Sequence, residues 1–256
     1  MDARDSFETV AELYGEVRQG YPAALFDDLA GLGALAPSAR VLEVGCGAGQ
    51  ASGELARRAG SLLAIDPGEK LVSEARARVT AENARFLVSG FEDLEIEPGG
   101  FDLVASAQAW HWIGPELAFP KAAAALAEGG WLAVFGHVPM APPERLWPAF
   151  KAAYDAHAPG VWGRPPPQAW YLPDGPVAGL FAASGRFEPV SRRAYAWDWT
   201  IDAATFGKYM RTDSGYRFLA EAPRQALFDA LAAAVEAGGG QITLAWRTHL
   251  YAARRL

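Results

Sequence analysis

The sequence is poor in the features that mark secreted, membrane-spanning and nucleic-acid-binding proteins. Cys46 is the only cysteine among 256 residues, so no disulfide can form within the chain, which favours a reducing compartment. No stretch approaches the roughly 18 consecutive apolar residues of a membrane-spanning helix, and the first residues lack the apolar core of a secretory signal. The formal net charge of −7 argues against general binding to phosphate backbones. We therefore expect a cytoplasmic protein that binds neither membranes nor nucleic acid.

Patterns for metal binding or thiol catalysis are lacking as well. The four histidines are scattered without the spacing of metal ligands; they are His111, His137, His157 and His249. Cys46 stands inside a glycine-rich loop, where a small packing residue is the simplest interpretation. We expect no metal site and no catalytic thiol.

The first half of the chain alternates short apolar runs with helical patterns. Predicted strands cover 39–45, 61–67, 85–89, 101–107 and 131–136, and predicted helices cover 50–59, 69–79 and 121–128. Because parallel strands need long crossovers, this alternation predicts a parallel sheet with helices on both faces. The fold class is α/β, Rossmann-like and doubly wound.

The second half is less regular. Segments 139–148 and 165–176 are rich in proline, with tryptophans in and near them, which predicts an irregular insertion covering the active site. Predicted helices follow at 200–211 and 223–237, and 241–252 reads as a late antiparallel strand. We thus expect one domain of four parts: an amino-terminal cover over about 1–37, a cofactor-binding core over 38–138, a substrate-side insertion with late sheet elements over 139–240, and a final strand over 241–256.

The stretch most indicative of function is Glu-Val-Gly-Cys-Gly-Ala-Gly-Gln at 43–50, between the first predicted strand and helix. Glycines there let the backbone turn tightly and approach a ligand. Three interpretations are open: a turn without a ligand, a dinucleotide site and an S-adenosylmethionine site. A dinucleotide fingerprint has a third glycine where this chain has Gln50. Glu43 would also repel a pyrophosphate, whereas it suits the ammonium and sulfonium of S-adenosylmethionine.

Asp66 ends the second predicted strand, at about the 20-residue distance from the glycine loop that a ribose-binding carboxylate keeps. Alone, it could equally cap a helix that begins at Pro67. Together with the loop it favours a nucleoside ligand.

These residues resemble the class I S-adenosylmethionine-dependent methyltransferases. Glu43 to Gly49 matches their E-x-G-x-G-x-G loop, and Asp66, 101–104 and 126–132 follow in the family's order. Within the family, Ala-Gln-Ala-Trp-His-Trp at 107–112 is similar to a segment of the branch of trans-aconitate methyltransferase-like enzymes. Residues 14–22 are similar to that branch's Y-x-x-x-R-P-x-Y-P, with Gln19 in place of the usual proline.

The resemblance implies S-adenosyl-L-methionine as cofactor, held by Arg18, Glu43, Gly45, Cys46, Gly47, Gly49, Asp66, Pro67, Gly90, Phe91, Glu92 and Gln108. The methionine part of the cofactor would lie against the three loop glycines, with Glu43 near its ammonium. Asp66 would bind the ribose. Pro67 and 90–92 would lie at the adenine, although the family more often has alanine at the position of Phe91. Gln108 would lie beside the sulfonium, and Tyr14 and Arg18 would belong to the cover.

Methyl transfer is an in-line displacement, so the protein supplies alignment and desolvation. A carboxylate acceptor needs only groups that orient it, whereas a hydroxyl or phenol benefits from a base. His111 is the leading candidate for either role, with a structural histidine as the alternative. Tyr14 is the second catalytic candidate. The expected partner is a small-molecule methyl acceptor that no motif names.

Three other functions compete with this prediction. An NAD(P)-dependent oxidoreductase is disfavoured by Gln50 and by the lack of a Tyr-x-x-x-Lys pair. A non-catalytic S-adenosylmethionine-binding module would keep the fold alone. An RNA or protein methyltransferase is disfavoured by the negative charge and by the lack of an N-P-P-Y-like motif.

Overall fold

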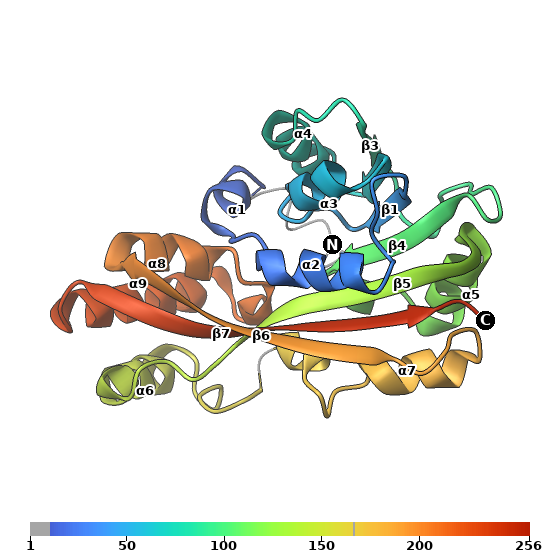
Figure 1. The fold of residues 1–256 in the computed structure, drawn as a ribbon. Coiled ribbons are helices and arrows are strands. Elements are labelled where there is room, and N and C mark those ends of the chain that lie inside the picture. Colours follow the sequence, from blue (N-terminus) through green and yellow to red (C-terminus); the bar gives the residue numbers. More distant parts are fainter. Residues whose placement is uncertain (1–10, 166) are drawn as a thin grey trace.

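The computed structural model describes residues 11–165 and 167–256 and contains one seven-stranded sheet in the order β3-β2-β1-β4-β5-β7-β6 (Figure 1). Its strands are β1 (Arg40–Val44), β2 (Ser61–Asp66), β3 (Ala84–Val88), β4 (Phe101–Ala107), β5 (Leu126–Pro139), β6 (Ser191–Asp202) and β7 (Gln241–Arg254). Strands β1 to β5 pair in parallel, and β7 runs antiparallel to both β5 and β6. The predicted Rossmann-like sheet with a late antiparallel strand is confirmed.

Helices cover both faces of this sheet. They are α1 (Ala11–Val17), α2 (Ala23–Gly31), α3 (Ser52–Arg58), α4 (Glu69–Arg78), α5 (Pro115–Ala125), α6 (Trp147–His157), α7 (Val177–Ser184), α8 (Ala203–Arg211) and α9 (Glu221–Ala237). Side chains alternate along a strand, so Val41 packs in the core with α2, α3 and α4, while Leu42 packs in the core with α5 and α7. The apolar runs of β1, β2, β4 and β5 are buried on both faces for this reason, whereas the edge strand β3 leaves Leu87 and Val88 exposed.

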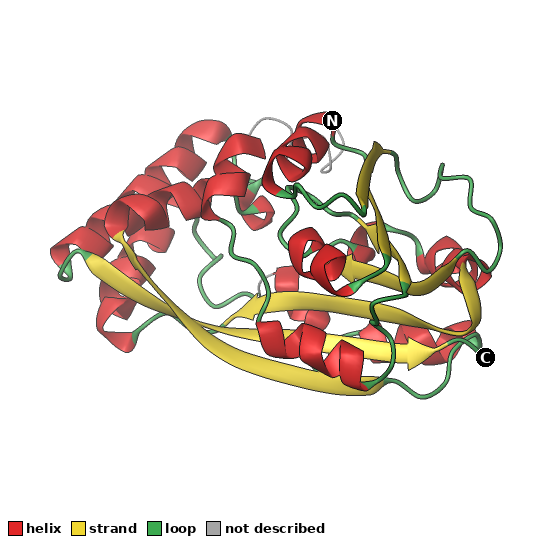
Figure 2. Cartoon of the chain, turned by 45° about the horizontal axis from the view of Figure 1, so that its top comes forward, coloured by secondary structure: helices red, strands yellow, loops and turns green. Residues whose placement is uncertain are grey.

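A third core lies beyond the parallel strands. Strands β6 and β7 form a long antiparallel pair that is connected through α8 and α9, and α6, α8 and α9 gather around its far end (Figure 2). Phe206, Leu227 and Trp246 are buried there. We call α6, α8 and α9 the helical lobe; it occupies much of the predicted insertion.

Two predicted helix boundaries were wrong. The helix predicted at 121–128 spans Pro115–Ala125, because a proline fits the first helical turn, and the next residues begin β5. The helix predicted at 200–211 begins at Ala203, because the Asp202 side chain accepts a hydrogen bond from Thr205 N at 2.7 Å and caps it. Strand β6, which ends at Asp202, was not predicted as an element.

The segment before α2 ties the two halves of the chain together. Arg18 Nε donates to Thr212 Oγ1 and Arg18 Nη2 donates to the Thr212 carbonyl, both at 3.0 Å, just after α8. From α8 itself, Lys208 Nζ donates to Glu16 Oε1 at 2.6 Å. The Arg78 guanidinium at the end of α4 donates to the Gly15 carbonyl. Helix α1 is thereby held between the parallel half and the helical lobe.

None of the helices in the described ranges is at once long enough and apolar enough to cross a bilayer.

An ion pair at the amino-terminal ends of the neighbouring strands β1 and β4 leads to a prediction about stability. Asp102 accepts hydrogen bonds from Arg40 N at 2.8 Å, Nε at 3.1 Å and Nη2 at 2.9 Å, and the side-chain bonds from Arg40 lower the pKa of Asp102. A half-exposed pair stabilises by about 0.5–1 kcal/mol, so Asp102→Asn is expected to lower the melting temperature by about 2 °C at neutral pH.

The gap between wild type and Asp102→Asn should depend on pH. A lowered pKa means that the pair stabilises the fold above the unfolded pKa of about 3.9 and ceases to do so as pH falls through the folded value. Thermal melts from pH 7 to pH 3 should therefore converge. Asp155→Asn, which breaks an exposed pair with Lys151, is the control and should shift the melting temperature less. A gap for Asp102→Asn that is constant with pH would contradict the prediction.

Candidate active site

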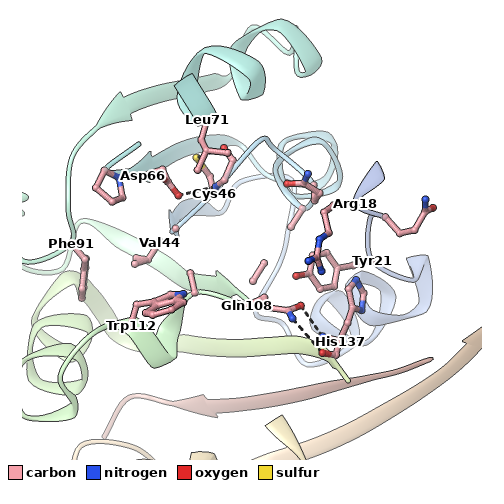
Figure 3. Close-up of a pocket in the computed structure, with 18 of the residues that line it drawn as sticks. Arg18, Tyr21, Val44, Cys46, Asp66, Leu71, Phe91, Gln108, Trp112 and His137 are labelled. Atoms are coloured by element: carbon pink, nitrogen blue, oxygen red, sulfur yellow. Dashed lines mark hydrogen bonds between the residues drawn. The ribbon is translucent and has the colours of Figure 1, made fainter. Parts of the chain in front are cut away.

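A cavity lies at the carboxyl ends of the parallel strands, where β1 has β2 on one side and β4 on the other (Figure 3). The connections after β1, β2, β3 and β4 all contribute to its lining, together with the segment that follows α1. Open α/β sheets bind ligands at this point, because the loops there diverge to opposite faces and leave a crevice. The predicted cofactor residues in the lining are Arg18, Gly45, Cys46, Gly47, Asp66, Pro67, Gly90, Phe91, Glu92 and Gln108.

The loop after β1 requires glycine. Gly45 has a φ of +74°, and a Cβ placed there would lie 2.1 Å from the Cβ of Ala109. Gly47 and Gly49 also have positive φ angles, of +54° and +83°. The Ile65 carbonyl accepts hydrogen bonds at 2.9 Å from the backbone N–H groups of both Gly45 and Cys46, which fixes the turn. The backbone therefore forms one wall of the cavity without intervening side chains.

Asp66 holds this loop from the end of β2. Its Oδ2 accepts from Gly47 N at 3.0 Å, and its Oδ1 accepts from Gly68 N at 2.9 Å. The side chain is 8% exposed and lines the cavity. Each carboxylate oxygen can accept more than one hydrogen bond, so the ribose contact that we predicted is compatible with both loop contacts.

Glu43 lies beneath the loop and outside the cavity lining. Ser52 Oγ donates to Glu43 Oε2, whereas Oε1 is buried with no hydrogen-bond partner among the described residues. Burial raises the pKa of Glu43 to about 8, an effect that Ser52 opposes and Asp66 reinforces. Gly49 is likewise absent from the lining, because it packs against Ala75 of α4. The contact of Glu43 with the cofactor ammonium stays a prediction.

The connection after β3 closes the other end. Phe91 is 2% exposed, and its ring lies 5.8 Å from that of Trp110 between centroids, with Lys121 Nζ 5.5 Å from its centre. Gly90 and Glu92 line the cavity on either side of it in sequence. Phe91 contributes an aromatic ring to this end, as an adenine site would use, and these contacts also stay predictions.

Gln108 adopts a conformation that is rare for a residue with a side chain. Its φ is +59°, and its backbone N–H donates to the Phe135 carbonyl at 2.7 Å. Its side-chain amide pairs with the backbone of His137: Oε1 accepts from His137 N at 3.1 Å, and Nε2 donates to His137 O at 3.4 Å (Figure 3). A left-handed residue costs about 1–2 kcal/mol, and such strain concentrates at functional sites.

Sequence reasoning missed an aromatic wall, which we define as Tyr21, Trp197, Trp199, Tyr209 and Trp246, all lining the cavity. Trp197 and Trp246 stack with centroids 5.7 Å apart, and the rings of Tyr209 and Trp246 meet edge to face at 5.9 Å. The wall joins the amino-terminal segment, β6, α8 and β7. The alternation in Ala-Trp-Asp-Trp-Thr at 196–200 was its one local signal, because it is typical of a strand with one aromatic face.

His137 supports this wall from β5. Its ring stacks on Tyr21 with centroids 4.2 Å apart, and Nδ1 lies 2.7 Å from Thr248 Oγ1, which also accepts from Trp197 Nε1 at 2.9 Å. Burial, with a smaller effect from the charge of Arg18, lowers the pKa of His137 to about 3. The imidazole is therefore neutral at physiological pH.

Neither of the two predicted catalytic residues, His111 and Tyr14, is found among the described residues that line the cavity. His111 is absent from the cavity lining: its Nδ1 lies 3.1 Å from the Tyr171 hydroxyl, and burial lowers its pKa to about 4. Its neighbour Trp112 lines the cavity instead. The surroundings of His111 are those of the structural alternative, and a role at the acceptor stays a prediction. Tyr14 belongs to α1, but its side chain lies outside the described residues.

Arg18 supplies a positive charge at the rim. Its guanidinium lies 4.7 Å from the centre of the Tyr209 ring and donates to Thr212 as described above. In the described ranges, no three His, Cys, Asp or Glu side chains are grouped so that they could hold a metal ion.

A family comparison bears directly on this cavity: residues 41–130 match the model of a methyltransferase domain. This segment has the sequence pattern of a methyltransferase domain. The match covers β1 to β4 and the start of β5, and so contains the glycine loop, Asp66 and the connections after β3 and β4.

Curated relatives of the methyltransferase domain share about half of the chain. An uncharacterized methyltransferase of Mycobacterium bovis is 32% identical over 127 residues, which is 50% of this chain and 50% of that protein. A ubiquinone biosynthesis O-methyltransferase of Xanthomonas campestris pv. campestris is 37% identical over 97 residues, or 37% of this chain and 41% of that protein. The chain thus spans about half the length of the first of these relatives and less of the second.

Solved structures share the fold over nearly the whole chain. A protein of Anaeromyxobacter dehalogenans, provisionally assigned as a type II methyltransferase, superposes with a TM-score of 0.63 at 24% identity, covering 93% of this chain and 97% of that one. A phosphoethanolamine N-methyltransferase of Haemonchus contortus, solved with S-adenosylhomocysteine, gives 0.57 at 16% identity, covering 99% and 60%. The similarity in fold therefore extends to β6, β7 and the helical lobe.

S-adenosylmethionine is the cofactor of this family, and the polar groups of the cavity suit it. Gln50 lines the cavity and its Nε2 is buried without a partner in the described part of the chain, as a donor for a carboxylate would be. The buried Oε1 of Glu43, which has no partner in the described part of the chain, lies under the same loop, and the Asp66 carboxylate lines the cavity at the end of β2. Gln50 and Asp66 thus offer polar groups that the carboxylate and the ribose of the cofactor would need, while the contact of Glu43 with its ammonium stays a prediction.

Proposed function

We propose that this chain transfers the methyl group of S-adenosylmethionine to a small-molecule acceptor. One observation carries the proposal: a single cavity joins the glycine loop and Asp66 of the methyltransferase domain to the aromatic wall of the carboxyl-terminal half. The first side suits a nucleoside with an amino acid, and the second leaves room for another molecule beside it. A reducing cytoplasmic location, in which Cys46 stays a thiol, belongs to the same proposal.

The bound cofactor supplies both the methyl group and the thioether leaving group. The chain's own contribution is to align the acceptor with the carbon–sulfur bond and to exclude water. The aromatic wall does both, since its rings are held by stacking and by the Thr248 hydroxyl rather than by the ligand.

An oxygen acceptor is favoured over other nucleophiles. The neutral His137 and the hydroxyl of Tyr21 lie on the acceptor side of the cavity, and Arg18 at the rim would orient an anionic group. The relative from Xanthomonas campestris is named an O-methyltransferase. The similarity of 107–112 to trans-aconitate methyltransferase-like enzymes points to a carboxylate oxygen, and the aromatic wall points to a phenolic or other hydroxyl oxygen. A panel of carboxylates and phenols therefore forms the acceptor screen.

The cofactor assignment is tested first. Calorimetric titration with S-adenosylhomocysteine is expected to give saturable one-to-one binding, with no heat from NADH or NADPH. Binding of a reduced nicotinamide alone would overturn the proposal and make the glycine loop a divergent dinucleotide site. With S-adenosylhomocysteine binding in hand, transfer of label from S-adenosylmethionine to the acceptor panel tests turnover.

A further inference from the structure

A second cavity adjoins the first on the side of the helical lobe. It has a volume of about 710 Å³ and lies between α6, α8, the start of β7 and the connection after β5. Tyr209 and Trp246 line both cavities, so these two rings stand at the junction between them. A molecule held against the aromatic wall therefore has a second space within reach.

The lining of this second cavity is mostly apolar. Aromatic side chains from α6, α8 and the connections that follow them converge on it: Trp147, Phe150, Trp162, Phe206, Tyr216 and Phe218. Among the described residues of the lining, the only formally charged side chains are those of Arg164 and Asp213. Apolar surface of this kind binds hydrocarbon and leaves polar groups unsatisfied.

The mouth of the cavity is apolar as well. Met140, Trp147 and Phe218 line it and are 42%, 41% and 63% exposed, although large apolar side chains are usually buried. Three such residues around one opening mark a ligand or interaction site.

The junction itself holds an unused donor. Trp246 is 4% exposed, and its Nε1 is buried with no hydrogen-bond partner in the described part of the chain. Leaving a buried N–H unsatisfied is costly, so this group points to a ligand atom that accepts from it.

We infer that the acceptor is an amphipathic small molecule, with its nucleophilic oxygen in the first cavity, a hydrogen-bond acceptor at Trp246 and a hydrocarbon arm in the second cavity. This inference rests on the proposed function and names its substrate class. The arm is hydrocarbon rather than peptide, because a peptide would bury backbone amides against a wall that offers few polar partners.

The test uses 4-alkylphenols from 4-ethylphenol to 4-octylphenol as probes, titrated into the protein saturated with S-adenosylhomocysteine. Affinity is expected to rise about four-fold for each added methylene until the arm fills the cavity, because each buried methylene gains a constant increment in free energy. An affinity that does not change with chain length would overturn the inference.

Two variants show whether the arm lies in this cavity. Leu244 lines it from β7 and is half-buried, so Leu244→Arg should lower the affinity for 4-octylphenol about ten-fold and leave 4-ethylphenol unchanged. The matched control is Leu87→Arg, an exposed leucine of β3 that lines neither cavity and should change nothing. Phe218→Ser, at the exposed mouth, tests the same point without introducing a buried charge. It should lower the affinity for 4-octylphenol about three-fold. Equal losses for the short and long phenols would overturn the inference.

Titration of S-adenosylhomocysteine on the same samples separates this test from that of the proposed function. If the protein did not bind S-adenosylhomocysteine but its affinity for the phenols still rose with chain length, the cavity would be a hydrocarbon site. The proposed methyl transfer would then be wrong. Dimerisation that Phe218→Ser abolishes in sedimentation velocity, combined with a flat series, would assign the cavity to a second copy of the chain and overturn the inference.

Discussion

Replacing Gly45 by alanine is expected to abolish measurable binding of S-adenosylhomocysteine and to lower the free energy of unfolding by about 3 kcal/mol. Two effects add at this position. A side chain at a φ of +74° is strained, and the new Cβ would lie 2.1 Å from the Cβ of Ala109, in the connection after β4. Relief of that contact requires the loop to move away from the cavity. Calorimetric titration and thermal melts measure the two effects separately.

Gly53→Ala is the matched control for this substitution. Gly53 lies in α3, eight positions further along, where a Cβ would meet only Val79 Cγ2 at 3.8 Å and φ is not positive. Alanine should stabilise this helix by about 0.5–1 kcal/mol and leave cofactor binding intact. If Gly45→Ala bound S-adenosylhomocysteine as wild type does, the loop would not be the cofactor wall.

The second large effect is expected at Asp66. Asp66→Ala should weaken S-adenosylhomocysteine binding by about 10- to 100-fold, because hydrogen bonds to a charged group contribute more than neutral ones. Part of this loss comes from the loop, since the carboxylate accepts from Gly47 N and Gly68 N. The far-ultraviolet circular dichroism spectrum should remain that of wild type, because the core strands keep all their contacts. Isothermal titration gives the affinity.

Two comparisons sharpen this result. Asp66→Asn keeps one acceptor oxygen and should fall between wild type and the alanine variant. Asp93→Ala alters an exposed aspartate after β3 that lines neither cavity, so its affinity for S-adenosylhomocysteine should equal that of wild type. An Asp66→Ala protein of unchanged affinity would remove Asp66 from the nucleoside site.

Sequence reasoning predicted the parallel half of the fold because its elements are specified locally. Strands β1, β2, β4 and β5 each contain a short apolar run whose alternate residues enter the two cores, as Val104 and Ala105 do in β4. Turn glycines further mark the boundaries, whereas the proline at the start of α5 was not used and the start of that helix was predicted too late. Strand β6 escaped prediction because its exposed edge carries Arg192, Arg193 and Asp198 among its aromatic residues, which weakens the apolar signal.

The same distinction applies to the cavity. The glycine loop and Asp66 were predicted because a contiguous motif and a fixed spacing carry them. The aromatic wall had no such motif, since Tyr21 and Trp246 come from opposite ends of the chain and meet only when β7 pairs with β5. His111 was favoured for its position after β4, whereas the turn there directs Trp112 to the cavity and His111 to Tyr171.

The place of β7 in the sheet also determines when the cavity can exist. Strand β7 is the last element in sequence, yet it lies between β5 and β6. Until residues 241–254 have folded, β5 has an open edge and β6 has no partner in the sheet. The tryptophans of β6 and β7 therefore cannot line the cavity before that. Contacts of such long range form slowly, because loop closure must precede the energy that they return. The acceptor side of the cavity is therefore expected to form at the final stage of folding, when a single strand completes the sheet and the aromatic wall together.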